Sequence, residues 1–173
     1  MSTLQVQTLQ GPTSGADSNT VRVADGHNLH AKGHVIQCVS DVGTPVASIE
    51  GSSVNNIDSG IGVVITPKFT GSRIIVSFNT AVSSVTETVG LGITAKLLNG
   101  SGTTLTRAFW INQTGGSGLR LYQGLAFEHE EVTTSLNPLT FKIYFNRTGA
   151  SPQAVVLAWA DTSYALTATE IAQ

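Results

Sequence analysis

The strongest constraint on the fold of this chain is a pair of short segments with a period of two, within residues 60–80 (GIGVVITPKFTGSRIIVSFNT). Apolar residues occupy every second position on both sides of a polar stretch: Ile61, Val63 and Ile65 before it, and Ile74, Val76 and Phe78 after it. This period predicts two β-strands. Pro67 cannot donate to a ladder, so we expect the pairing of the two strands to stop at a short loop. Neither strand has a cleanly polar side, which favours a sandwich or a packed oligomer.

The same period continues along the chain and no helical period is sustained. Further strands are predicted at 35–39, 46–49, 91–97, 104–111, 119–128, 139–145, 154–160 and 164–171. The polar segment 51–59 is predicted to be a loop, and Asn99-Gly100 is typical of a hairpin turn. About eight to ten short strands separated by turn signals predict an all-β fold, an antiparallel β-sandwich or jelly roll. We expect this head to span residues 34–173, after an extended segment at 1–33 that has too few apolar residues for a core of its own.

The composition excludes several classes of partner. Only 12% of the 173 residues are charged, against about 25% in ordinary soluble domains. A low charge content is expected for a chain that buries part of its surface in an oligomer, and equally for a neutral monomer. A net charge of −2 gives no indication of nucleic-acid binding. The chain begins with no signal peptide, and its apolar runs are too short for membrane insertion.

The single cysteine and three of the four histidines lie within residues 27–38. Cys38 lies within an apolar alternation, which predicts a buried thiol. The three closely spaced histidines His27, His30 and His34 would meet their copies around a threefold axis and bind a metal there, or they are polar loop residues. His-x-x-His on an extended chain converges poorly on one ion. We therefore predict no metal and no cofactor.

No catalytic constellation is present in the sequence. It has no Gly-x-Ser-x-Gly elbow, no phosphate-binding glycine-rich loop before a helix and no His-Glu-x-x-His. A glycosidase needs two opposed carboxylates, and spacing selects no pair among Asp41, Glu50, Asp58, Glu87 and Asp161. The acidic run at 128–131 (EHEE) is predicted to be a solvated strand end. We expect no enzymatic activity.

Three segments resemble bacteriophage tail-fibre and virion-appendage proteins that have a trimeric, tumour-necrosis-factor-like β-sandwich head. The first is a strand that ends in Ile65-Thr66-Pro67, followed by a polar turn and a strand opened by Arg73. The second is the leader MSTLQVQTLQGPTSGADSNTVRV, followed by KGHVIQ, and the third is the closing strand YALTATEI. The resemblance implies a homotrimer whose residues 1–33 attach to other virion proteins.

On this resemblance, the expected function is that of a structural virion protein, assembled in the host cytoplasm. We expect a short tail or baseplate fibre with a distal head that contacts the host surface, because neither heptads nor collagen-like repeats lengthen it. A capsid fibre or decoration trimer is one alternative, and a carbohydrate-binding β-sandwich domain is another.

The host-contact candidates lie around the loop at 112–118 (NQTGGSG). Exposed aromatic and amide groups on loops suit a surface glycan, which selects Trp110, Asn112, Thr114 and Ser117. The alternative for Trp110 is a core residue at a strand end.

Overall fold

The computed structural model describes residues 31–43, 57–86, 91–112, 119–148, 155–157 and 163–173, all of which belong to one compact unit, Ala31–Gln173. Within these ranges the chain forms nine strands and no helix, so none of them offers a helix able to cross a membrane. The strands are β1 (Val35–Gly43), β2 (Ile57–Ile65), β3 (Arg73–Thr86), β4 (Leu91–Asn99), β5 (Thr104–Asn112), β6 (Leu119–Val132), β7 (Leu139–Thr148), β8 (Val155–Leu157) and β9 (Tyr164–Ile171).

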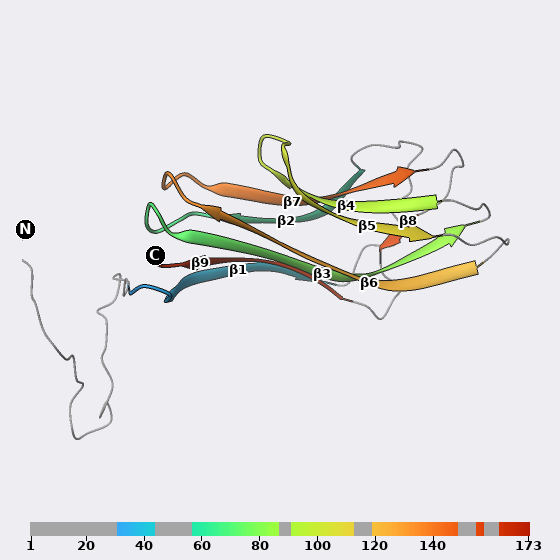
Figure 1. Ribbon diagram of the computed structural model, residues 1–173, viewed down its shortest axis with the longest axis horizontal. Helices are drawn as coiled ribbons and strands as arrows, with labels where there is room; N and C mark the ends of the chain where they lie inside the picture. Colours follow the sequence, from blue (N-terminus) through green and yellow to red (C-terminus); the bar gives the residue numbers. More distant parts are fainter. Residues whose placement is uncertain (1–30, 44–56, 87–90, 113–118, 149–154, 158–162) are drawn as a thin grey trace, which may run out of the picture. The chain divides into compact units, whose positions relative to one another are not determined.

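The strands form two antiparallel sheets that face each other (Figure 1). Sheet A has the order β1-β9-β3-β6, with β8 also paired to β3, and sheet B has the order β2-β7-β4-β5. The predicted all-β sandwich is therefore confirmed.

The strand order is that of a jelly roll. Apart from the short β8, strands from the start of the unit pair with strands from its end: β1 with β9, β2 with β7, β3 with β6 and β4 with β5. The described chain thus follows the course of one long hairpin wrapped over itself, which places eight strands in two sheets of four, with β8 added to sheet A as its fifth strand. Among the strands of the described residues, β4 and β5 are consecutive in sequence and pair with each other as a simple hairpin.

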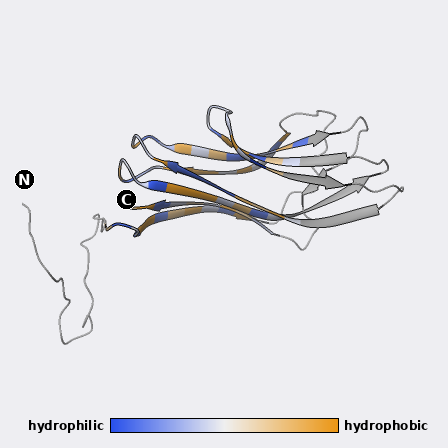
Figure 2. Cartoon of the chain, in the orientation of Figure 1, coloured by the Kyte–Doolittle hydropathy of each residue, from blue (hydrophilic) through white to orange (hydrophobic). Residues whose placement is uncertain are grey.

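The core lies between the sheets and is built by the alternation seen in the sequence. Buried apolar side chains from both sheets fill it, including Ile61, Val63, Ile65, Ile74, Val76, Phe78, Leu97, Phe141, Ile143, Phe145 and Leu166. Hydrophobic and hydrophilic residues accordingly alternate along the described strands (Figure 2). The sequence therefore predicts correctly which residues of β2, β3 and β7 face the core.

The predicted pairing of β2 with β3 is wrong. β2 pairs with β7 in sheet B, whereas β3 pairs with β6, β9 and β8 in sheet A. Residues 66–72, named here the β2–β3 arch, carry the chain from one sheet to the other. A period of two gives the face of each strand but does not choose the neighbouring strand.

The turn between β4 and β5 differs from the expected two-residue turn. The positive φ falls on Gly102 (83°), and Asn99 N donates to Thr103 O at 3.0 Å. The side-chain oxygen of Asn99 accepts from Ser101 N at 3.2 Å and from Thr103 N at 2.8 Å. An asparagine that bonds nearby amides in this way stabilises a longer loop.

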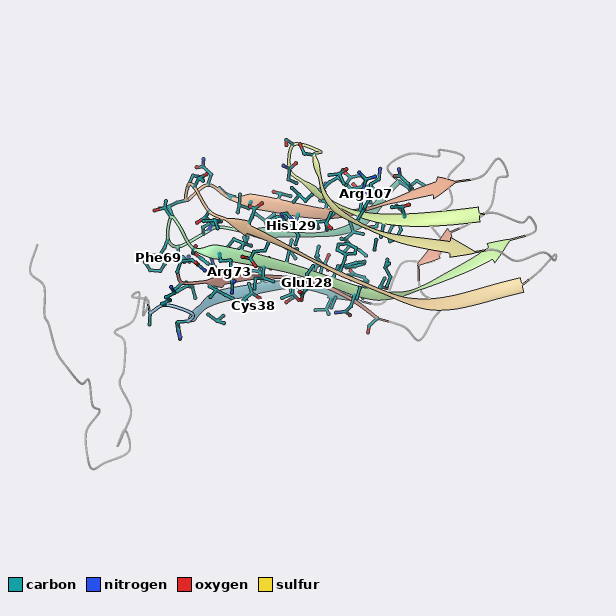
Figure 3. The ribbon with its side chains drawn as sticks, viewed as in Figure 1. Cys38, Phe69, Arg73, Arg107, Glu128 and His129 are labelled. Carbon is teal, nitrogen blue, oxygen red and sulfur yellow. The ribbon has the colours of Figure 1, made fainter. Side chains whose placement is uncertain are left out.

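The burial predicted for Cys38 is also wrong. The thiol is exposed, on β1 at the edge of sheet A, opposite Thr169 (Figure 3). Its neighbour Val39 stands opposite the buried Ala168 and packs against the core. The residues of β1 do alternate between the two faces of sheet A, but Cys38 is one of those that face outward.

Candidate functional site

The sequence-predicted host-contact residues are only partly within the described structure. The backbones of Trp110 and Asn112 lie in β5, opposite Ile93 and Leu91 of β4. Thr114 and Ser117 lie outside the described residues, as do His27 and His30 of the metal hypothesis. His34 is exposed just before β1. No group of three or more His, Cys, Asp or Glu side chains that suits a metal occurs in the described ranges.

The acidic run at 128–131 is not simply a solvated strand end, because β6 continues through it to Val132. Glu128 and Glu130 are exposed, and Glu130 lies 3.5 Å from Arg73 Nη1. His129 and Glu131 instead stand opposite the buried Val76 and Ile74. These two side chains therefore lie on the inner side of sheet A, with His129 Nε2 3.6 Å from Glu131 Oε2. Figure 3 labels Glu128 and His129 on β6 and Arg73 on the neighbouring strand β3.

Within the described residues, several hydrogen bonds converge on the carboxylate of Glu170, in β9, which is fully buried. Four donors converge on it: Ser72 Oγ at 2.6 Å, Gln37 Nε2 at 2.7 Å, Lys68 N at 3.0 Å and Phe69 N at 3.2 Å. Three of these donors belong to the β2–β3 arch and the fourth to β1. One carboxylate thus holds the chain where it crosses from sheet B to sheet A.

The charge state of Glu170 follows from these contacts. Burial acts to raise the pKa of its carboxyl group, because a charge is poorly solvated there. The hydrogen bonds from Ser72, Lys68, Gln37 and Phe69 outweigh burial and lower the pKa below its ordinary value. Glu170 is therefore an ionised residue at neutral pH, with its acceptor sites occupied by protein donors. Such a group is structural, since it has no free face for a substrate.

Two of the segments that carry the appendage resemblance meet at this carboxylate. The Thr66-Pro67 turn begins the β2–β3 arch, and Glu170 lies in the closing strand. Gln37 Nε2 also donates to Thr66 O at 2.7 Å, which ties the turn to β1. The resemblance in these segments therefore corresponds to one hydrogen-bonded joint, which the sequence alone did not connect.

A second polar cluster lies on the outer face of sheet B, where β2 is bulged. Asp58 stands opposite Tyr144 and Gly62 opposite Lys142, so that three residues of β2 (59–61) face the single Ile143 of β7. Gly60 has φ 74°, a conformation that favours glycine. The sequence interpretation had assigned Asp58 to a polar loop. The Asp-Ser-Gly sequence that bends the strand was the signal available for this bulge.

The bulge creates a depression of about 250 Å³ between β2 and β7. Its lining includes Asp58, Gly60, Gly62, Val64, Thr140 and Lys142. Asp58 Oδ2 accepts from Tyr144 OH at 3.2 Å and lies 3.8 Å from Lys142 Nζ. Asp58 Oδ1 accepts from Gly60 N at 2.9 Å. Asp58 and Lys142 thus place a carboxylate and an ammonium group in the lining of the hollow, and the phenol of Tyr144 orients the carboxylate.

A similar hollow lies between the β4–β5 turn and the start of β7, next to Glu131. Its one amide side chain, Asn99, is committed to the turn through Ser101 and Thr103. The side chains of Ser101, Glu131 and Thr140 also belong to residues that line this hollow, and Glu131 Oε2 lies 3.6 Å from His129 Nε2.

No protein-family model matches this chain, and no curated protein matches it either. Among solved structures it is similar to the VP2 subviral particle of infectious bursal disease virus, with 15% identity over 92% of this chain and a TM-score of 0.45. It is also similar to the Gx strain of that virus (15%, 92%, TM-score 0.42) and to dimeric latent PorU from Porphyromonas gingivalis (12%, 90%, TM-score 0.32).

The chain spans only 37%, 36% and 15% of the lengths of these three proteins. The jelly-roll assignment rests on the strand order of this chain itself.

Proposed function

We propose that this chain is a structural virion protein that forms the head and attachment segment of a short trimeric bacteriophage tail or baseplate fibre. One observation carries the proposal: the turn motif and the closing strand of the resemblance form a single joint around Glu170, within a jelly roll. The proposal includes no catalytic role, no cofactor and no metal.

Within this proposal the two parts of the chain have different roles. Residues 1–33 attach to other virion proteins, and the jelly roll contacts the host surface. Gly33 N donates to Ala172 O at 2.8 Å, so the last residue of the attachment segment is anchored on the jelly roll. Trp110, Asn112, Thr114 and Ser117 remain the proposed contacts to a host receptor, and the particle is assembled in the host cytoplasm.

The head is expected to be a homotrimer in solution. The resemblance to trimeric appendage proteins supports this expectation, and the low charge content is compatible with surface buried between copies. Light scattering of the purified chain at micromolar concentration should give close to three times 18.0 kDa. A monodisperse monomer under these conditions would contradict the trimer.

The position on the particle is expected to be the tail or baseplate. An affinity tag fused after the exposed Gln173 leaves the ladder of β9 intact, since this strand ends at Ile171. Imaging of tag-labelled particles should place the label on the tail, with untagged particles as the control. Label on the capsid shell with a bare tail would contradict this position and favour a capsid fibre or decoration trimer.

A further inference from the structure

We propose that the depression over the β2 bulge binds a neutral saccharide through adjacent hydroxyl groups. The inference rests on the proposed host-contact function, which gives a reason for a carbohydrate ligand on the head. It assigns that ligand to the outer face of sheet B. The described residues of its lining belong to β2 and β7.

The polar groups of the depression suit a pair of sugar hydroxyls. A carboxylate has about four lone-pair sites, and Gly60 N and Tyr144 OH occupy two of those on Asp58. One hydroxyl of the sugar donates to Asp58, and its neighbour accepts from the ammonium group of Lys142, which has three donors. Thr140 adds a hydroxyl group to the same lining.

The bulge is fixed before any ligand arrives. Ser59 Oγ donates to Ile143 O at 2.6 Å and accepts from Ile61 N at 3.1 Å, which holds the extra residues against β7. Gly62 N donates to Asp41 Oδ2 at 3.0 Å, which ties the bulge to β1 of sheet A. Asp41 is itself held by Tyr164 OH at 3.0 Å. A site that is already ordered loses less free energy on binding.

The shape of the depression suits one sugar ring. Its volume of about 250 Å³ lies just below the ~300–1,000 Å³ of pockets for drug-sized ligands. Gly60 and Gly62 leave the floor free of side chains. A Cβ at Gly62 would lie 3.2 Å from Phe141 O and 3.3 Å from Lys142 Cγ, closer than ordinary van der Waals contact. Val64, which is 56% exposed, offers an apolar wall to the C–H groups of a sugar.

The charges of the depression exclude other ligand classes. Asp58 and Lys142 compensate each other, so the site does not favour an anion such as phosphate. Calcium takes six to eight oxygen ligands, whereas Asp58 is the only carboxylate among the described residues of the lining. A neutral molecule with several hydroxyl groups matches the remaining chemistry.

The test is a titration of the full chain, labelled with nitrogen-15, with the methyl glycosides of glucose, galactose and mannose. At least one of them should shift the backbone amide signals of Gly60, Gly62 and Val64 in a saturable manner. Asp58→Asn should weaken this binding about tenfold, since hydrogen bonds to charged groups are stronger than those between neutral groups. Lys142→Met, which keeps the aliphatic stem, should also weaken it.

Glu130→Gln is the matched control. Glu130 is a carboxylate of similar exposure (53% against 48% for Asp58) with a cation at a similar distance, but it lies on sheet A. This variant should bind like the unchanged chain, and the amide spectra report at once whether each variant is folded.

The proposal would be overturned if none of the glycosides shifted these amide signals at 50 mM, which is about ten times a weak dissociation constant of ~5 mM. It would also be overturned if the Asp58→Asn variant bound as tightly as the unchanged chain, or if only an anionic sugar such as sialic acid bound there. The titration is separate from the tests of the fibre proposal. A monomeric mass or a capsid location would refute the fibre without changing which amides shift, and a failed titration would leave the trimer and its tail location standing.

Discussion

Replacing Glu170 with alanine is expected to lower the free energy of unfolding by about 3–5 kcal/mol, out of the ~5–15 kcal/mol typical of a domain. The carboxylate accepts from Ser72 Oγ, Gln37 Nε2 and the amides of Lys68 and Phe69 in a fully buried position. Its removal takes this acceptor from the amides of Lys68 and Phe69, at about 1–3 kcal/mol for each buried donor that water does not reach, whereas Gln37 Nε2 keeps its bond to Thr66 O and Ser72 Oγ its bond to Phe69 O. The large effect thus comes from the donors left behind.

Urea denaturation at pH 7 measures this effect, and Glu130→Ala provides the control. Glu130 is exposed and forms an exposed ion pair with Arg73, so its removal should change stability by less than about 0.5 kcal/mol. A Glu170→Ala variant within 1 kcal/mol of the unchanged protein (the order of one ordinary hydrogen bond) would show that the joint is not a determinant of stability.

The pH dependence of stability gives a second readout of the same variant. The pKa of Glu170 is lowered in the folded protein from its ordinary value of 4.5. The unfolded chain therefore binds the proton more readily, and stability rises with pH through this range. The contribution is fully present above pH 4.5 and is lost as the pH falls through the lower, folded pKa. Glu170→Ala should lack this part of the acid destabilisation.

Phe78→Ala is the second change with a large expected effect, again about 3–5 kcal/mol. Phe78 is 1% exposed in β3, the strand of sheet A that pairs with β6, β8 and β9. Its ring centroid lies 5.3 Å from that of Phe127, with the planes tilted by 47°. Truncation removes the buried ring and leaves a cavity at the junction of three strands.

Phe78→Leu keeps a large apolar side chain at this position. It should lower the free energy of unfolding less than Phe78→Ala does, because leucine fills much of the cavity. Val64→Ala on the outer face of sheet B is the matched control, with an expected change of less than about 0.5 kcal/mol. Chemical denaturation of the three variants measures the differences. Equal costs for Phe78→Ala and Val64→Ala would contradict the position of Phe78 in the core.

The faces of the strands could be predicted from sequence because alternation is a local property. Phe141, Ile143 and Phe145 were placed on one apolar face, and all three are buried. The neighbours of each strand could not be predicted in this way. β3 pairs with β6 and β9, which lie far from it in the sequence. The alternation of apolar residues within a strand contains no information about such distant partners.

The polar sites show a similar division. Asp58 was visible as a carboxylate, but its orientation depends on a bulge that is defined only by the register with β7. The importance of Glu170 depends on donors from the β2–β3 arch, about 100 positions earlier. The sequence predicts the wrong side of β1 for Cys38, which is exposed. The two sides of this edge strand differ little in their content of apolar residues, so the sequence does not show which side is buried.

The position of β9 between β1 and β3 has a consequence for folding during synthesis. Ser40 and Thr167, which bond across β1 and β9, are 127 positions apart. A ribosome must therefore make almost the whole jelly roll before sheet A can close, and contacts of such long range slow folding. Until β9 emerges, the edges of β1 and β3 that it will cover remain open to pairing with other chains. The yield of soluble protein should therefore depend on how long the nascent chain waits in this open state.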